Sequence, residues 1–398
     1  MYPTIYHAVK DLFGLDLPGL KLLQSFGFFV AIAFLLAAVF LAKEIRRREK
    51  LGQFTPSTRR VKIGVPATAQ ELITQFFFGF IIGWKIVGLL IDEGATADPR
   101  AYVLSTEGNL IAGMLLGIVF AGWRWYSANK KKLPEPKEIE EKVSAADHVG
   151  NITLMAALGG IIGAKLFHIL ENLKQLGGER LERTGQTFGE AFSEMLFSFS
   201  GLTMYGGLIV GGLAVLWYAR RHKMPLLHVM DAAAPSLMLA YGVGRIGCQV
   251  SGDGDWGVVN TSPAPSFLPQ WAWGYTYPNN VNEEGVPIPG CEGDHCTQLP
   301  EPVWPTPLYE AVTCILFFFI LWAIRKRVTA PGQLFSIYLI MNGVERFCIE
   351  LIRVNEEMFR IGSFKVTQAE FIAVILVLLG CTGLWWTRKR RKEKLQGT

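Results

Sequence analysis

Residues 26–50 read FGFFVAIAFLLAAVFLAKEIRRREK, an uncharged apolar run that ends in a dense basic cluster. An apolar helix of roughly 20 residues crosses the hydrocarbon core of a bilayer, and Lys and Arg collect on the cytoplasmic side of such helices. The stretch therefore predicts a transmembrane helix whose amino end lies outside. A cleavable signal peptide would carry a basic cluster before its apolar part, and this run has none, so we expect it to remain attached.

The composition of the chain favours a membrane protein over a soluble one. Hydrophobic residues make up 50% of the 398 residues, charged residues make up only 18%, and the mean hydropathy is +0.28. Apolar stretches long enough to span a bilayer predict an all-α polytopic integral membrane protein with about nine transmembrane helices. These stretches centre near Ala33, Ile82, Leu116, Gly160, Gly211, Leu237, Phe317, Ile340 and Ile375.

The basic residues predict the topology. The net charge of +5 comes from short clusters that follow apolar runs, so it does not indicate a nucleic-acid partner. Residues 248–305 contain no Lys or Arg, and we expect them to form a small soluble cap on the outer face of the membrane, with the carboxyl terminus on the cytoplasmic side. The clusters expected on the cytoplasmic side are residues 43–50, 130–132, 220–223, 325–327 and 388–391.

A short motif occurs twice along the chain. Residues 79–85, GFIIGWK, resemble residues 159–165, GGIIGAK, which predicts a duplicated helical hairpin. Spaced glycines also let transmembrane helices pack closely without any duplication, so both interpretations stay open. The predicted segments are the first helix with its basic end (1–50), a transmembrane hairpin and cytoplasmic linker (51–142), core helices with a periplasmic arm (143–247), the periplasmic head loop (248–306), and core helices with a basic tail (307–398).

Residues 244–257, GRIGCQVSGDGDWG, mark the place where an apolar helix gives way to a glycine-rich acidic loop on the outer side. This arrangement puts Arg245 at the outer interface of the membrane. An arginine there either extends toward the headgroup region or forms part of a phosphate site beside the glycine backbone.

A second arginine-bearing helix favours the phosphate site. Asn342, Arg346, Glu350 and Arg353 recur at offsets of 4, 8 and 11, which places them on one stripe of an otherwise apolar helix. Ionisable groups in a bilayer are costly unless they are paired or face a wet cavity. We therefore expect Glu350 to orient one or both arginines, and the two arginine-bearing helices to bind a phospholipid phosphate.

Two further motifs lie at the predicted outer surface. Tyr205-Gly206-Gly207 opens a span, where the tyrosine is either an interfacial anchor or a hydrogen-bond donor or base, and the glycines permit close packing or lipid access. In Trp304-Pro-Thr-Pro-Leu-Tyr309-Glu310 the prolines fix a helix start. We expect Tyr309 and Glu310 at the mouth of an outer cavity.

These four motifs, in this order and topology, resemble the prolipoprotein diacylglyceryl transferase family. The resemblance covers residues from about 151 to 386 and the first span, and it leaves the hairpin near residues 68–129 as an addition. It implies a transferase that moves the sn-1,2-diacylglyceryl group of phosphatidylglycerol to the lipobox cysteine thiol of a prolipoprotein signal sequence. A thioether forms and glycerol 1-phosphate is released. The implied partners are phosphatidylglycerol, the prolipoprotein and membrane lipids. The implied location is the bacterial inner membrane, with a periplasmic cap and an active site that faces the periplasm.

The resemblance also implies the site residues. Arg245 and Arg346 match the two phosphate-site arginines of the family. Where the family has His, Asn and Glu, this chain has Tyr205, Cys248 and Asp253, so we expect the substrate thiol to lose its proton beside the cationic cluster, with Tyr205 or Asp253 as acceptor. The expected catalytic residues are Arg245, Arg346, Tyr205 and Asp253, and the expected substrate-binding residues are Arg245, Arg346, Arg353, Glu350, Gly206, Gly207, Cys248, Ser251, Gly252, Gly257 and Tyr309.

We expect neither a metal nor an organic cofactor, because phosphate is a competent leaving group once arginine matches its charge. Cys291 and Cys296 stand close together in the polar loop and predict a disulfide in an oxidising envelope. The same loop, with Asp294 and His295, could bind a metal, although it lacks a second half-site.

Two other functions fit parts of the sequence. The repeated glycines and the membrane-buried Lys85, Lys165, Arg346 and Glu350 are compatible with a transporter for an anionic solute. The substitutions from the family pattern are compatible with a catalytically silent relative that only binds lipid.

Overall fold

The computed structural model describes residues 1–92, 102–103, 105–173, 187–197, 203–291, 294–354, 357–361 and 364–396. Most of this part is helical, and it contains seven helices that are long and apolar enough to cross a membrane, which confirms the all-α polytopic class. They are α2 (Ser25–Lys50), α3 continued by η2 and α4 (Ala69–Ile91), α6 (Leu110–Lys130), η3 with α7 (Ala145–Glu171), α11 (Leu226–Ser251), α12 (Thr306–Ile324) and the first part of α14 (Gln368–Gln396).

The other two predicted spans are also helices, but they are more polar. α10 (Met204–Arg221) ends in two arginines, and α13 (Gln333–Glu350) carries two acids and Arg346 in its last turns. Neither is among the seven candidate spans of the described residues. All nine predicted apolar stretches are helical, and seven of these helices are long and apolar enough to cross a membrane.

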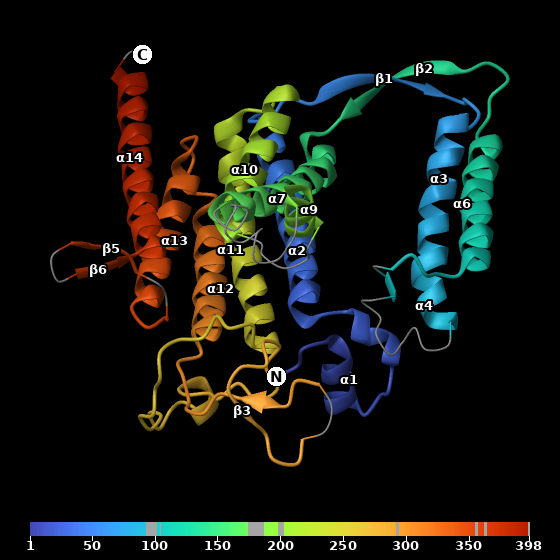
Figure 1. Ribbon diagram of the computed structural model, residues 1–398. Coiled ribbons are helices and arrows are strands. Elements are labelled where there is room, and N and C mark those ends of the chain that lie inside the picture. Colours follow the sequence, from blue (N-terminus) through green and yellow to red (C-terminus); the bar gives the residue numbers. More distant parts are fainter. Residues whose placement is uncertain are drawn as a thin grey trace.

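The centre of the bundle is α11, which packs against α2, α12 and α13 (Figure 1). Its Met238 is fully buried, as are Cys314 and Leu321 of α12 and Leu334 of α13. α7 packs along α10, and α14 packs along α13. Because α11 has neighbours on several sides, the polar groups at its ends have little access to lipid.

A buried ion cluster around Glu44 closes one end of the bundle. The Glu44 carboxylate accepts hydrogen bonds from Arg47 Nη2 at 2.5 Å, Arg48 Nε at 2.8 Å and Arg325 Nε at 3.1 Å. Asp231 lies nearby, 3.6 Å from Arg48, and accepts the amides at the start of α13. Two basic clusters that the sequence assigns to one side of the membrane thus meet at one end of the structure.

The opposite end carries the head, residues 252–305, built from loops, η5 (Gln270–Ala272) and the short strands β3 (Val286–Pro287) and β4 (Thr297–Gln298). Tyr277 is fully buried among the head's aromatic and aliphatic side chains and donates a hydrogen bond to Gln249 of α11 at 2.8 Å. Burial raises the pKa of the Tyr277 phenol, so it remains a donor.

The predicted disulfide between Cys291 and Cys296 is present in the head. Both sulfur atoms are consumed by it, so the metal alternative for this loop is wrong. The amino-terminal segment, with α1 (Ile5–Phe13) and η1 (Pro18–Leu22), lies on the same side as the head (Figure 1). The terminal amine of Met1 donates to the Pro278 carbonyl at 2.7 Å.

The hairpin of α3 (Ala69–Ile81), η2 (Ile82–Val87), α4 (Gly88–Ile91) and α6 stands apart from the bundle (Figure 1). A two-stranded antiparallel ribbon, β1 (Ser57–Ile63) with β2 (Lys137–Val143), connects it to the bundle. The remaining elements are η3 (Ala145–His148), α7 (Val149–Glu171), α9 (Phe188–Phe197), β5 (Glu357–Ile361) and β6 (Phe364–Thr367).

The repeated motif has the same packing role in both hairpins. A Cβ atom on Gly83 would lie 2.2 Å from the Ala112 carbonyl oxygen of α6, and one on Gly163 would lie 2.3 Å from the Gly206 carbonyl oxygen of α10. Both sites therefore require glycine for close helix contact. Lys85, in the first copy, donates to the carbonyls of Tyr102, at 3.1 Å, and Ser105, at 2.6 Å. This lysine closes the loop before α6.

Candidate active site

Three helix ends and one loop bring charged side chains together beside the head. Arg245 lies in the last two turns of α11, Glu310 in the first turns of α12, and Arg346 in the last turns of α13. Asp255 follows α11 in the loop that leads into the head. These positions are distant in sequence, and the packing of α11 against α12 and α13 is what joins them.

Glu310 stands between the two predicted phosphate-site arginines. Its Oε2 atom lies 2.5 Å from Arg245 Nε, as an ion pair outside hydrogen-bond geometry, and its Oε1 atom accepts from Arg346 Nη1 at 3.1 Å. The Glu310 side chain is almost completely buried. One carboxylate thus fixes two guanidinium groups from different helices next to each other.

Glu350 orients Arg346 from one turn further along α13, as its spacing predicts. Its Oε2 atom lies 2.9 Å from Arg346 Nη2, and its Oε1 atom accepts a hydrogen bond from the Thr367 hydroxyl at 2.7 Å. Thr367 precedes α14, so this contact also ties the end of α13 to the next helix.

Asp255 connects the remaining arginine to the cluster. Its two carboxylate oxygens contact Arg245 and Arg353, and its carbonyl oxygen accepts from the Thr306 hydroxyl at 2.5 Å. The Asp255 side chain is 27% exposed, whereas that of Glu310 is 1% exposed. Asp255 is therefore the more solvent-accessible of these two carboxylates.

Gly257 allows the loop to approach α13 closely. A Cβ atom at Gly257 would lie 2.4 Å from the Ile352 carbonyl oxygen, and Gly257 forms a backbone bridge with Arg353. The amide of Val258 donates to Ile352 at 2.9 Å. The motif glycine is needed here to bring Asp255 and Arg353 together.

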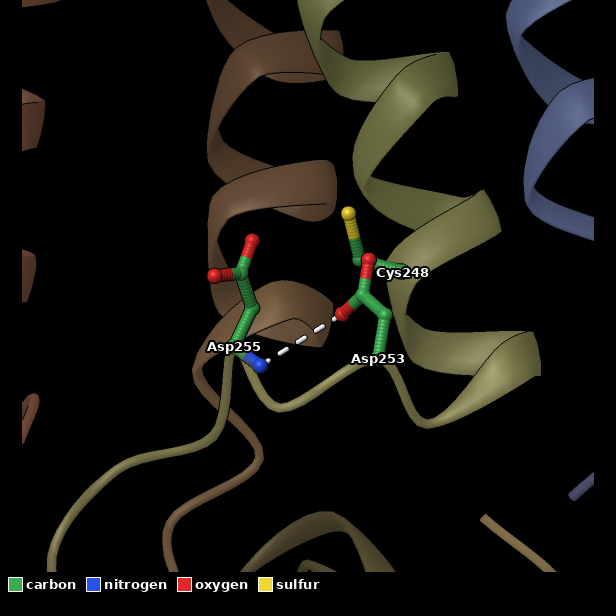
Figure 2. A group of neighbouring side chains, drawn as sticks. All are labelled: Cys248, Asp253 and Asp255. Atoms are coloured by element: carbon green, nitrogen blue, oxygen red, sulfur yellow. Dashed lines mark hydrogen bonds between the residues drawn. The ribbon is translucent and has the colours of Figure 1, made fainter. Parts of the chain in front are cut away.

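Figure 2 shows Cys248, Asp253 and Asp255 grouped at the end of α11. Their thiol and carboxylate atoms lie within 4.8 Å of one another, which is compatible in distance with a metal site. Asp255 is already paired with Arg245 and Arg353, and these fixed positive charges oppose a bound cation. The Cys248 thiol lies 3.7 Å from Arg245 Nη1. Chemically, the group is better suited to organising an arginine than to holding a metal.

The predicted residues fall into two groups. Arg245, Arg346, Arg353 and Glu350 form the cluster, and Cys248 borders it. Tyr205 is half-buried and lies within electrostatic range of Arg346. Four other predicted substrate-binding residues and Tyr309 make structural contacts: Gly206 and Gly207 face α7, the Ser251 hydroxyl donates to Gly247, Gly252 ends α11 with φ of 65°, and Tyr309 donates to Ala272.

The loop acid that pairs with Arg245, in addition to Glu310 of α12, is Asp255, two residues beyond the predicted site residue Asp253. Asp253 accepts the Asp255 amide at 3.4 Å instead (Figure 2). From the sequence we predicted no ion-pair partner for Glu310, and we did not identify Tyr241 as a site residue. The Tyr241 ring lies 5.2 Å from the Arg245 guanidinium carbon. The signal for Tyr241 was its position one helical turn before Arg245.

Comparisons with known proteins agree with the motifs. A family model described as prolipoprotein diacylglyceryl transferase matches residues 108–386, which include α6 but not α2 or α3. A phosphatidylglycerol–prolipoprotein diacylglyceryl transferase of Leptospira interrogans is 30% identical over 56% of this chain and 67% of its own length. The enzymes of that name from Mycobacteroides abscessus and Clostridium tetani are 27% and 26% identical, over 71% and 59% of this chain and 74% and 78% of their own lengths.

Proposed function

Because the chain belongs to the prolipoprotein diacylglyceryl transferase family, we propose that it transfers the sn-1,2-diacylglyceryl group of phosphatidylglycerol to the lipobox cysteine of a prolipoprotein. The observation that carries the proposal is the pair Arg245 and Arg346, held together by Glu310 at the head end of the bundle. A pair of guanidinium groups from two helices matches the oxygens of a phosphodiester.

In the proposed reaction the cysteine sulfur attacks the glycerol carbon that bears the phosphate oxygen. The carbon–sulfur bond forms as the carbon–oxygen bond breaks, and glycerol 1-phosphate leaves with the bonding electron pair. Negative charge grows on the phosphate in the transition state, and prepositioned arginines stabilise it without reorganising. Arg245 and Arg346 perform this task, while Arg353 adds a third positive charge through Asp255.

The thiol proton needs an acceptor near the cationic cluster. Tyr205 and Asp253 are the groups that we propose, because Tyr205 lies within electrostatic range of Arg346 and the Asp253 carboxylate lies within 4.8 Å of Asp255, which pairs with Arg245. The positive cluster itself favours the thiolate form of the incoming cysteine. This chemistry calls for no metal or organic cofactor, since the phosphate is already a leaving group.

We place the site on the periplasmic side of a bacterial inner membrane. The cluster lies beside the head, whose loops lack Lys and Arg, and the Glu44 cluster with its basic residues lies at the other end. Phosphatidylglycerol would enter from the outer leaflet. The lipobox cysteine of the prolipoprotein would approach at the same level of the membrane.

The test is complementation of a bacterium depleted of its own diacylglyceryl transferase, together with transfer assayed on the purified protein. Restored thioether lipidation by the parent chain and its loss in Arg245→Ala and Arg346→Ala support the proposal. A parent chain that binds phosphatidylglycerol but forms no thioether would leave the silent lipid-binding function in its place. Transport of an anionic solute without lipidation would favour the transporter.

A further inference from the structure

Glu345 is a buried acid that the proposed mechanism does not use. It directly precedes Arg346 in α13, and only 4% of its surface is exposed. Neither of its carboxyl oxygens has a hydrogen-bond partner among the described residues. A buried carboxyl group without a partner is costly, and natural proteins keep few of them.

The surroundings of Glu345 connect it to the arginine cluster. Two of the helices that pack against α13 contribute charged or titratable groups within electrostatic range of it, and α13 itself contributes two more. These groups are Tyr241 and Arg245 of α11, Glu310 and Cys314 of α12, and Tyr338 and Arg346 of α13.

Among the described residues, the arginines near Glu345 are already paired with other carboxylates. Glu310 already occupies Arg245 and Arg346, Glu350 occupies Arg346, and Asp255 occupies Arg245 and Arg353. An additional unpaired negative charge in a low-dielectric interior is strongly unfavourable, and the group avoids this cost by keeping its proton. Glu345 is therefore a neutral acid at neutral pH, with one hydroxyl donor.

Lipid binding creates an acceptor for this donor. The phosphodiester and Glu310 would compete for the same two guanidinium groups, since Glu310 contacts both of them. When phosphate oxygens take these donors, the Glu310 carboxylate loses its hydrogen bond from Arg346 and its ion pair with Arg245 while it stays buried. A replacement donor must then be close at hand.

We propose that Glu345 is a positioning residue that acts through Glu310, donating a hydrogen bond to its carboxylate when a phosphodiester occupies Arg245 and Arg346. The inference rests on the proposed function only in taking phosphatidylglycerol as the ligand. Ionisation of Glu345 removes the donor and adds a negative charge beside the anion site. Phosphatidylglycerol should consequently bind less tightly in alkaline solution.

The test measures phosphatidylglycerol binding to the full-length protein in a neutral detergent, by displacement of a fluorescently labelled phosphatidylglycerol. Glu345→Gln keeps an N–H donor and cannot ionise, whereas Glu345→Leu has no donor. At pH 7 the glutamine variant should bind within about threefold of the parent, and the leucine variant at least about tenfold more weakly. Between about pH 7 and pH 9 the parent should lose affinity and Glu345→Gln should not.

Two results would overturn the inference. The first is a glutamine variant as weak as the leucine variant at pH 7, which would mean that a charged carboxylate is required. The second is a glutamine variant with the same alkaline loss as the parent. If Glu345→Leu fails to fold, as judged by thermal unfolding, the pH profile of Glu345→Gln alone decides. Transfer assayed in the same samples separates the two proposals, because a parent that binds the lipid without transferring it refutes only the proposed function.

Discussion

Two buried ion clusters hold the two ends of the helix bundle, and they differ in the source of their carboxylates. At the basic end, Glu44 of α2 binds Arg47, Arg48 and Arg325, and its side chain has no exposed surface. At the head end, one of the carboxylates, Asp255, comes from a loop and is partly exposed.

This difference separates a structural cluster from one that can exchange a partner. We expect no phosphate to replace Glu44, because its arginine partners belong to α2 and the end of α12, at the end of the bundle opposite the head. Asp255 can move with its loop, and a phosphate can take its place on Arg245 and Arg353. We expect substitutions at the first cluster to change stability and substitutions at the second to change transfer.

The largest effect should come from the guanidinium groups at the head end. Arg346→Ala should lower the rate of diacylglyceryl transfer about 1,000-fold, since it removes a prepositioned donor to the developing phosphate charge. Arg346→Lys keeps the charge but not the planar pair of donors, so it should recover only part of the rate. Transfer by purified protein, normalised to folded material, gives the measurement. Near-parental activity of Arg346→Ala would place the phosphate elsewhere.

The next largest effect should be a loss of stability at the other end. Glu44→Gln leaves three arginines with a neutral partner, and the cost should be about 3 kcal/mol of unfolding free energy. Thermal unfolding in detergent would show this as a lower midpoint. The transfer rate per folded molecule should stay at the parental value, and a large fall in that rate without a change of midpoint would contradict the comparison.

A smaller effect in the opposite direction is expected at Asp255. Asp255→Asn weakens a competitor for Arg245 and Arg353, so the KM for phosphatidylglycerol should fall about threefold. Titration of the lipid in the transfer assay measures it. Gln at Glu301, an exposed acid elsewhere in the head, is the control and should leave the KM unchanged. An increase of KM in Asp255→Asn would mean that the carboxylate serves mainly to position the arginines.

The smallest effect should be that of Thr367→Val, which removes the hydroxyl that Glu350 accepts at 2.7 Å. The loss of one hydrogen bond to a charged group is worth about 1–2 kcal/mol at most. We expect a decrease in transfer of about twofold, because Arg346 is held less rigidly. The control is Thr387→Val, at a buried threonine far along α14. If both variants lose stability and activity equally, the contact between Thr367 and Glu350 stabilises the helix packing and does not position Arg346.

The sequence predicted the helices and the arginine pair for physical reasons that act locally. Apolar length determines a span, and offsets of 4 and 8 along one helix place Arg346 and Glu350 on one face whatever the fold. The pairing of Glu310 with Arg245 depends on how α12 packs against α11, which no periodicity encodes. The sequence therefore predicted both Arg245 and Arg346 as site residues, but it did not predict that the Glu310 carboxylate pairs with them.

Loop residues were harder to assign than helical ones. Asp253 and Asp255 differ by two positions in a glycine-rich turn, and the turn geometry decides which of them reaches the guanidinium groups. The motif glycines Gly206 and Gly207 were expected to contact substrate, and the structure places them against α7. The sequence alone could not distinguish the two roles, because the lack of a side chain permits close helix packing as well as ligand access.

The ribbon of β1 and β2 makes the outlying hairpin detachable in principle. Ser57 and Val143 are cross-strand partners, so the chain leaves the bundle and returns to it at points only about 5 Å apart. The residues between Ser57 and Val143 therefore form an insertion between α2 and α7. A shortcut of a few residues could join those two points, and the interior of the bundle would keep its neighbours, which makes this region open to gain, loss or exchange during evolution.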